Sequence, residues 1–207
     1  MATATEKEPS PAGTSGLFLR KFLRHGTRVA SFTPSSRSLA AAMCGAIDSN
    51  RPQTIVEVGA GTGAVTDAAL GRMHPYSRLV AIEIDSDFAD ILRARCPQAL
   101  TVCGNVRDID AQLDALGVDH IDVLLSGLPV PSLPRLLNGA LFKCLAERGR
   151  EAVFSQLTLM PWVYWRMYER LFEQVDFRLV VGNLPPGGVY HCRRLRADYA
   201  DHLPGGR

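Results

Sequence analysis

The strongest constraint on the fold is a glycine-rich turn that directly follows a short apolar segment. Residues 54–58 read Thr-Ile-Val-Glu-Val, and Gly59, Gly61 and Gly63 follow at once. A β-branched run of this length favours a strand, and residues 64–73 suit a helix. Glycine tolerates left-handed backbone and lets the chain approach a ligand closely. The pattern therefore predicts a strand, a tight turn and a helix, with a small-molecule site at the turn.

Apolar segments and helical segments alternate along the rest of the chain. Strands are expected over 54–58, 78–84, 99–103, 121–126, 152–157, 177–181 and 189–195. Helices are expected between the first six strands, over 64–73, 85–95, 108–116, 132–146 and 162–172. This alternation predicts an α/β fold whose parallel sheet is covered on both faces. Only a Gly/Pro-rich loop joins the last two strands, so they should form an antiparallel hairpin.

Composition limits the class of protein. The chain has 207 residues, of which 46% are hydrophobic and 21% are charged, as is typical of one globular domain. A net charge of +2 is too small to indicate a general nucleic-acid binder. No uncharged run is long enough to span a bilayer. The five cysteines form no C-x-x-C pair, so no metal site and no disulfides are expected, and reduced thiols indicate the cytoplasm.

Four regions are expected along the chain. Residues 1–16 are rich in small residues and Pro and should form a disordered tail. Residues 17–48 should form a basic, amphipathic helical segment, residues 49–197 the α/β domain, and residues 198–207 a C-terminal tail.

The helix expected at the start of the 17–48 segment would separate aromatic from basic side chains. The residues concerned are Phe18, Arg20, Lys21, Phe22, Arg24 and Arg28. Such a helix suits an anionic membrane surface, where each basic residue adds about 1 kcal/mol of attraction. Two other interpretations stay open: the apolar face packs on the α/β domain, or the basic face binds RNA phosphates.

Two acidic residues and the glycine spacing point to the cofactor. Glu83 follows Gly63 by twenty residues, at the end of the second expected strand, where a carboxylate can accept hydrogen bonds from both ribose hydroxyls of an adenosine. Dinucleotide-binding enzymes and S-adenosylmethionine (SAM) methyltransferases share this arrangement. The G-x-G-x-G spacing differs from the pyrophosphate-binding turn, and Glu57 lies inside the motif; both features favour SAM.

The motif at 57–63, followed by Ala-Ile-Glu-Ile-Asp at 81–85, resembles the class I SAM-dependent methyltransferases. The resemblance implies a Rossmann-like fold with a seven-stranded, mostly parallel sheet that ends in an antiparallel hairpin. It also implies that SAM is the cofactor and S-adenosylhomocysteine (SAH) the product. The implied SAM-binding residues are Glu57, Gly59, Gly61, Gly63, Glu83, Asn105 and Ser126.

The same resemblance assigns a role to each of these residues. The glycine turn would line the methionine part of SAM, and Glu57 would order that turn. Glu83 would hold the ribose, and Asn105, after the third strand, would meet the adenine. Ser126, at the end of the fourth strand, would face the methyl group.

The likeness narrows further when other segments are included. Base-amine methyltransferases resemble one another in carrying an aromatic residue after the fourth strand, which stacks on an extruded base. This chain has Val130 there, after Ser-Gly-Leu-Pro at 126–129. Together with Thr-Pro-Ser-Ser at 33–36 and Asn-Leu-Pro-Pro-Gly-Gly-Val-Tyr at 183–190, the chain is similar to bacterial soluble phospholipid N-methyltransferases.

This second resemblance implies methylation of the phosphatidylethanolamine headgroup toward phosphatidylcholine. The protein would act as a monomer attached peripherally to the inner face of the cell membrane, with anionic lipid as a partner and nucleic acid disfavoured. Two alternatives stay open: methylation of RNA adenine, in the manner of ribosomal RNA adenine N6-methyltransferases, and a non-catalytic SAM-fold protein that senses lipid.

Candidate catalytic residues are Ser126, Tyr190 and His191. Ser126 could orient the attacking amine, and His191 could accept its proton. An aromatic cluster could bind a methylated ammonium by cation–π contact, anchor the protein at the interface, or simply pack in the core; its members are Trp162, Tyr164, Trp165 and Tyr168. Arg37, Arg193 and Arg194 are candidate partners of the lipid phosphate.

Overall fold

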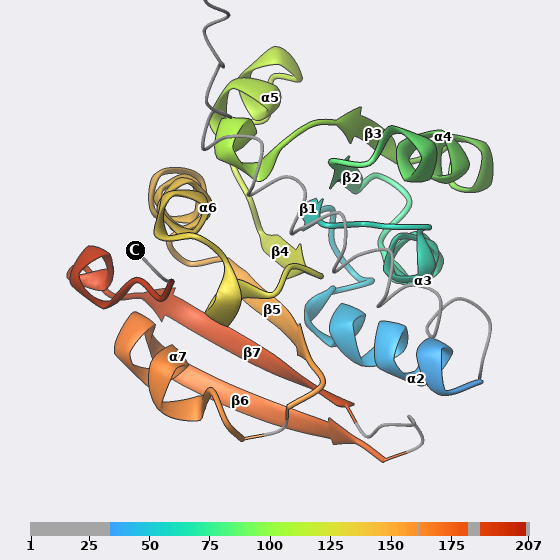
Figure 1. The fold of residues 1–207 in the computed structure, drawn as a ribbon. Helices are drawn as coiled ribbons and strands as arrows, with labels where there is room; N and C mark the ends of the chain where they lie inside the picture. The colour runs from blue at the N-terminus through green and yellow to red at the C-terminus, as the bar shows by residue number, and fades with distance from the viewer. Residues whose placement is uncertain (1–33, 161, 182–186, 206–207) are drawn as a thin grey trace, which may run out of the picture.

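The computed structural model describes residues 34–160, 162–181 and 187–205. Its sheet has seven strands in the order β3-β2-β1-β4-β5-β7-β6 (Figure 1). The strands are β1 (Thr54–Val58), β2 (Arg78–Glu83), β3 (Leu100–Cys103), β4 (Val123–Ser126), β5 (Val153–Thr158), β6 (Phe172–Val180) and β7 (Gly187–Leu195). Strands β1 to β5 run parallel, and β7 is antiparallel to both β5 and β6. The expected α/β fold with its closing hairpin is confirmed.

Helices cover both faces of the sheet. They are α2 (Pro34–Met43), α3 (Ala64–Arg72), α4 (Ser86–Arg95), α5 (Ile109–Ala115), α6 (Arg135–Arg148) and α7 (Trp165–Leu171), with single 3-10 turns at η1 (Cys44–Ala46), η2 (Val106–Asp108), η3 (Val130–Ser132) and η4 (Tyr199–His202). In Figure 1, α2, α3 and α4 lie on one side of the sheet and α5, α6 and α7 on the other.

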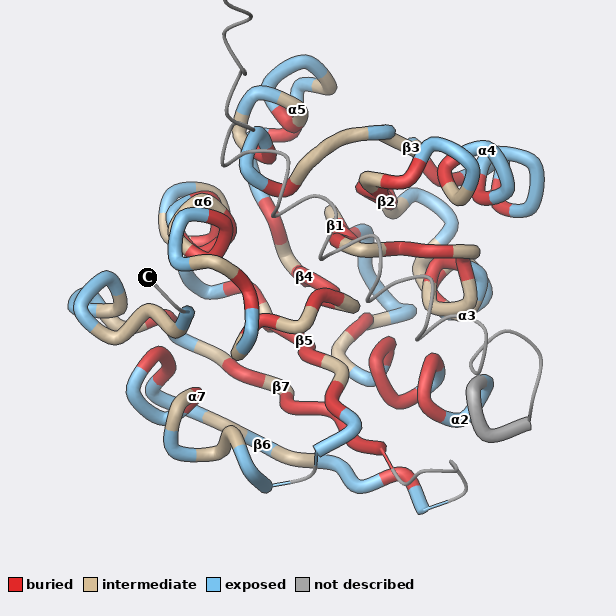
Figure 2. The backbone as a smooth tube through the Cα atoms, in the orientation of Figure 1, coloured by how far each residue is buried: buried red, intermediate tan, exposed pale blue. Residues whose placement is uncertain are grey.

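The alternation of side chains along the strands produces two hydrophobic cores. Val56 and Leu124 point toward α5 and α6, whereas Ile55 and Leu125 point toward α2 and α3. All four are fully buried, and each such aliphatic side chain contributes about 1.5–3 kcal/mol when it is removed from water. Figure 2 shows the central strands β1, β4 and β5 mostly in red, whereas stretches of the surrounding helices are pale blue.

Two predicted boundaries are wrong. The helix expected over 162–172 is only Trp165–Leu171, and the strand expected over 177–181 starts earlier, at Phe172. Residues 172–180 lie at the sheet edge and bury few side chains, so their apolar pattern is weak. Their backbone groups are paired by β7, which the local sequence does not reveal.

Part of the segment expected over 17–48, and the C-terminal residues after 197, pack against the α/β domain. Residues 1–33, with the basic helix predicted there, lie outside the described residues. Helix α2 buries Leu39 and Met43 in the core beside α3, so residues 34–46 pack as part of the α/β domain. The chain after residue 197 docks on α6, where Asn138 Nδ2 donates to the Pro204 carbonyl at 2.9 Å.

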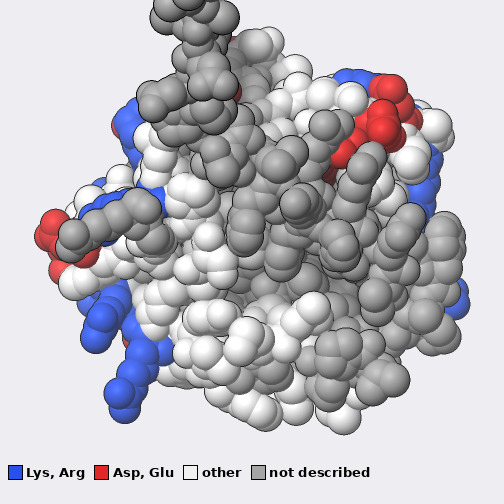
Figure 3. Space-filling view, in the orientation of Figure 1, with Lys and Arg blue, Asp and Glu red and all other residues white. Residues whose placement is uncertain are grey.

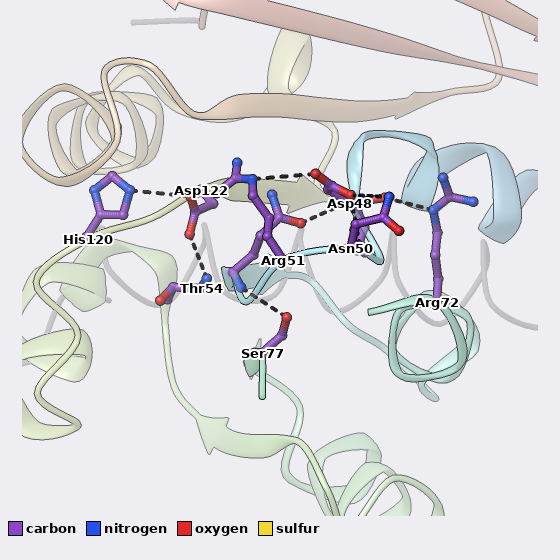
Figure 4. A network of polar contacts seen from close by, with 10 residues as sticks. Asp48, Asn50, Arg51, Thr54, Arg72, Ser77, His120 and Asp122 are labelled. Carbon is purple, nitrogen blue, oxygen red and sulfur yellow. Dashed lines mark hydrogen bonds and ion pairs between the residues drawn. The ribbon is translucent and has the colours of Figure 1, made fainter. Parts of the chain in front are cut away.

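A polar network ties the amino ends of β1 and β4 together (Figure 4). Asp122 accepts hydrogen bonds from the Thr54 backbone at 2.8 Å and from the Arg51 guanidinium at 3.3 Å. Asp48 lies 3.5 Å from Arg51 on the other side. These contacts lie at the amino ends of the strands, whereas the glycine turn follows the carboxyl end of β1, so they order the sheet without touching the turn.

Two features of the described residues bear on partners. None of their helices is both long and apolar enough to cross a membrane. Their His, Cys, Asp and Glu side chains form no group suited to a metal ion.

Candidate functional site

The glycine turn adopts the backbone that its sequence predicts. Gly59, Gly61 and Gly63 have φ values of 73°, 56° and 88°, a region in which side chains are strained. A Cβ atom at Gly59 would lie 2.6 Å from the Leu128 side chain, and one at Gly63 would lie 2.6 Å from Leu92. Conformation therefore favours glycine at all three positions, and at Gly59 and Gly63 a larger residue would also have to displace the end of a leucine side chain.

Glu57 is buried beneath the turn. Its carboxyl oxygen accepts a hydrogen bond from the Thr66 hydroxyl of α3 at 2.6 Å, which connects β1 to the helix that follows the turn. Burial raises the pKa of Glu57 to about 8, and the nearby Glu83 charge adds to the rise. A carboxyl group in this state orders the turn and offers a site of negative charge once a cation lies beside it.

Glu83 ends β2 and holds the turn from the other side. One carboxylate oxygen accepts from the Gly61 backbone N–H at 2.7 Å, and the other accepts from the Asp85 N–H at 2.9 Å. Burial raises the pKa of Glu83, while these backbone donors act against the rise. The Ile84 N–H also faces this carboxylate, so three backbone donors use part of its acceptor capacity, and the contact with the ribose hydroxyls stays a prediction.

Asn105 follows β3 at the same edge of the sheet. Its side-chain oxygen accepts from the Arg107 N–H at 2.9 Å and caps η2. The Gln112 amide donates to the Asn105 carbonyl at 3.0 Å and fixes this turn. The contact of Asn105 with adenine stays a prediction.

The end of β4 approaches the glycine turn very closely. Gly127 donates to the Val58 carbonyl at 2.9 Å, and a Cβ atom at Gly127 would lie 2.6 Å from the Gly59 carbonyl oxygen. The backbone of the Ser-Gly-Leu-Pro segment therefore packs directly on the backbone of the glycine turn, which explains the glycine after Ser126.

Ser126 belongs to a row of residues that runs across neighbouring strands. In register, Val58 pairs with Ser126, Ser126 with Gln156, and Gln156 with Tyr190. Residues paired in this way point to the same face of the sheet. The Ser126 hydroxyl is fully buried, yet within the described part of the chain it has no hydrogen-bond partner.

Gln156 is a candidate site residue that the sequence interpretation missed. Its amide nitrogen donates to the carbonyls of Leu128 and Leu157, each at 2.8 Å. Two acceptors on one end of the amide decide which atom is nitrogen, so the oxygen points the other way. That oxygen is buried and has no donor among the described residues. Only the cross-strand register with Ser126 would have revealed it.

Tyr190 is completely buried at the end of this row. Its ring lies 4.8 Å from those of Tyr168 and Phe177, centroid to centroid, and 6.2 Å from Trp165. Burial raises the pKa of Tyr190, opposed by the backbone N–H groups of Trp162 and Tyr164 that face its hydroxyl. Tyr168 is fully buried in the same core as Phe172, which favours the packing role for this aromatic residue.

His191 lies on the opposite face of the sheet from Ser126 and Tyr190. Its Nδ1 is 2.8 Å from the Ser155 hydroxyl, and its Nε2 would be 3.4 Å from a Cβ atom at Gly45. Burial lowers the pKa of His191. The structure thus does not bring the three candidate catalytic residues together, and proton transfer by His191 stays a prediction.

The three candidate arginine partners of a phosphate lie apart. Arg37 is exposed on α2. Arg193 is 2.9 Å from Asp176, and Arg194 is 4.0 Å from both Glu151 and Glu173. Because β7 runs away from the cofactor edge, Arg193 and Arg194 lie toward the amino ends of the parallel strands and are poorly placed for a headgroup near Ser126.

Comparison of the chain with characterised proteins identifies its family. No family model matches the sequence. The chain is 41% identical over 187 residues to an ornithine lipid N-methyltransferase of Singulisphaera acidiphila, covering 88% of this chain and 97% of the relative. The chain belongs to the SAM-dependent lipid N-methyltransferase family. SAM is the cofactor of this methyltransferase, and its glycine turn and paired acids fit that group.

More distant matches include another methyltransferase sequence and solved structures that share the fold. The methyltransferase is 31% identical over 112 residues to ribosomal RNA small subunit methyltransferase A of Dechloromonas aromatica, which covers 54% of this chain and 40% of that relative. Its fold matches the 1,6-didemethyltoxoflavin-N1-methyltransferase of Burkholderia thailandensis, bound to SAH, with a TM-score of 0.65, 16% identity and 94% coverage of both chains. An O-methyltransferase of Bacillus cereus in complex with SAH matches with a TM-score of 0.59, 14% identity, and coverage of 90% of this chain and 92% of that chain.

Proposed function

We propose that this methyltransferase transfers methyl groups from SAM to the primary amine of a zwitterionic membrane lipid, with phosphatidylethanolamine as the expected substrate. The observation that carries the proposal is the pair of buried oxygens at Ser126 and Gln156 on adjacent strands, which have no partner among the described residues. A buried acceptor without a donor is costly, about 1–3 kcal/mol, and a ligand that brings N–H groups to these strand ends would remove that cost.

A primary amine can satisfy both acceptors at once. A neutral primary amine carries two N–H bonds, one for the Ser126 hydroxyl and one for the Gln156 oxygen, and keeps its lone pair free for the methyl group. Holding the nitrogen in this orientation lowers the entropic part of the activation barrier, because the two reactants are already positioned for the reaction.

The cofactor supplies an electrophilic methyl group on a sulfonium, and the chain supplies position and a dry environment. The ammonium must lose one proton before it attacks, and burial beside Ser126 lowers the pKa of such a group and so favours the neutral form. His191 lies on the opposite face of the sheet from Ser126, so it is not placed to accept that proton. Arg193 and Arg194 have no phosphate-binding role in this proposal, because they lie toward the other sheet edge.

The lipid class is distinguished by its anionic group. Phosphatidylethanolamine carries a phosphate beside the amine, whereas the lipid named for the Singulisphaera acidiphila relative carries ornithine, an amino acid. Both present a primary amine at a membrane surface. Methylation of RNA adenine is the competing function. Val130 disfavours it, because this residue is buried in the core and provides no aromatic ring on which an extruded base could stack.

The test is methyl transfer from labelled SAM to three substrates: vesicles with phosphatidylethanolamine, vesicles with ornithine lipid, and ribosomal RNA. Lipid products are separated by thin-layer chromatography. We expect labelled lipid, absent when Glu57 or Glu83 is changed to Ala. Label in RNA alone would refute the proposal, and label only in ornithine lipid would correct its substrate.

Variants at the strand ends test the amine interaction itself. Gln156→Leu should lower kcat/KM for lipid about 10- to 100-fold and leave the SAH dissociation constant nearly unchanged, as loss of a hydrogen bond to a polar substrate predicts. Ser155→Ala is the matched control, because Ser155 is buried one residue earlier and faces the other side. Equal losses in both variants would contradict the role of Gln156. A loss in Ser155→Ala that alters the pH profile would instead implicate His191.

A further inference from the structure

Exposed apolar side chains gather on two segments at the cofactor edge of the sheet. We call these residues the apolar tip: Leu159, Met160, Trp162 and Val163 after β5, and Leu179 and Val181 at the end of β6. The two segments are neighbours, because Thr158 and Leu179 both pair with Gly188 of the intervening strand β7. Figure 2 shows exposed backbone at both strand ends.

The clustering sets these residues apart from ordinary exposed side chains. Ten large hydrophobic residues are exposed in the described part of the chain, and six of them form the apolar tip. The others, such as Tyr76 and Leu136, occur singly elsewhere, which is normal for a protein surface. A contiguous apolar surface marks an interaction site.

Trp162 is held in its exposed position by the fold. Its side chain is 61% exposed, yet its backbone has a φ of 66°, which is strained for an aromatic residue. Its ring rests against Phe177 with centroids 5.9 Å apart, and its backbone N–H faces the Tyr190 hydroxyl. A tryptophan that is rigid at its base and open at its outer side is suited to a membrane–water interface.

The charges beside the apolar tip fit lipid phosphates. Along the chain, Arg166 is the first charged residue after the tip segment of β5, and Arg178 directly precedes Leu179. Both are exposed, and no ion pair joins either of them to another residue that the structure describes. Figure 3 shows an uncharged surface over the β5–α7 connection and β6, with Lys and Arg side chains at its border beside α7.

We propose that the apolar tip inserts into the lipid bilayer and carries the open edge of the sheet to the headgroups. Gln156 lies three residues before Leu159 on the same strand and connection, so an inserted tip sets the amine-binding acceptors just above the membrane plane. This inference rests on the proposed function in one respect: it takes a membrane lipid to be the substrate that must reach this site. The basic stretch at 17–33 would add a separate, electrostatic attraction.

Trp162 offers a direct measurement of insertion. The chain has two tryptophans, so Trp165→Phe leaves Trp162 as the single tryptophan fluorophore. With vesicles of phosphatidylethanolamine and phosphatidylglycerol, we expect a blue shift of its emission and quenching by lipids brominated on the acyl chains. Both should persist at about 1 M salt, where attraction between exposed charges is screened. Emission that is unchanged by vesicles, or already blue-shifted without them, would overturn the proposal; the latter means that the chain itself covers the tip.

Paired charge variants test whether the apolar tip matters for lipid turnover. Val163→Asp combined with Val181→Asp should weaken vesicle binding at least tenfold and raise KM for vesicle lipid, while kcat/KM for a dispersed short-chain amine lipid and SAH binding stay unchanged. Tyr76→Asp combined with Leu136→Asp adds the same charges at exposed apolar positions outside the tip and should change none of these. Equal vesicle binding by both pairs refutes insertion, and a dimer that dissociates only in the first pair shows that a second copy occupies the tip.

The two proposals fail in different ways. If no lipid is methylated but Trp162 is still quenched by brominated lipid, the docking surface stands and the proposed function falls. If lipid is methylated and the apolar tip variants behave as the parent protein, the proposed function stands and the docking surface falls.

Discussion

Gly127→Ala is the sharpest test of how the substrate strand is joined to the cofactor turn. The added Cβ atom would lie 2.6 Å from the Gly59 carbonyl oxygen, against an ordinary contact of at least 3.4 Å. The two backbone segments must therefore move apart by about 0.8 Å. The neighbour is backbone rather than a flexible side chain, so no rotamer change relieves the contact.

The expected cost follows from overpacking. Forcing one methyl group into a tightly packed site costs about 1–3 kcal/mol. For a domain of this size, 1 kcal/mol lowers the melting temperature by about 2–4 °C. The displaced atom belongs to Gly59, which begins the cofactor turn, so we expect the SAH dissociation constant to rise about tenfold or more.

The measurement is calorimetric titration with SAH beside thermal unfolding. Gly71→Ala is the control, because Gly71 lies in α3, where an added Cβ would meet no atom within 4 Å, and replacing glycine in a helix stabilises by about 0.5–1 kcal/mol. If Gly127→Ala binds SAH as the parent protein does and melts at the same temperature, the close packing of Gly127 on Gly59 is refuted.

Three further outcomes are expected. The pKa of Glu57 is raised to about 8 in the fold from an ordinary 4.5, so the cofactor-free protein should lose stability as the pH rises between these values. Glu57→Gln should flatten this slope in urea titrations at pH 5 to 9. A parent protein that gains stability over this range would contradict the buried neutral carboxyl. Asp122→Ala should lower the free energy of unfolding by about 1–3 kcal/mol, because it leaves the Thr54 N–H without its acceptor, while SAH binding at the far edge is retained. Asn138→Ala should lower the free energy of unfolding by a similar amount of about 1–3 kcal/mol, since the Asn138 amide donates to the carbonyls of Val130, Leu133 and Pro204. An unchanged unfolding curve would show that these hydrogen bonds do not stabilise the fold.

Much of the cofactor site could be predicted because its requirements are local. The three glycines adopt positive φ values that other residues avoid, and Asp85 caps α4 by accepting from the Asp87 N–H at 3.0 Å, a contact between residues two apart in sequence. Edge strand β6 could not be delimited, because its stability comes from pairing with β7 rather than from its own apolar pattern. His191 and Tyr190 are adjacent in sequence, yet a strand places them on opposite faces, so adjacency along the chain does not make them one catalytic group.

By itself the amino-acid order determined the α/β fold, the glycine turn and the acid at the end of β2, because strand periodicity and turn conformation are set over a few residues. Only the tertiary structure decided that Ser126 and Gln156 form one pair of buried oxygens with no partner among the described residues, and that Trp162 and Val181 belong to one surface. These groupings depend on the register between strands far apart in the chain, which hydrogen bonding across the whole sheet establishes.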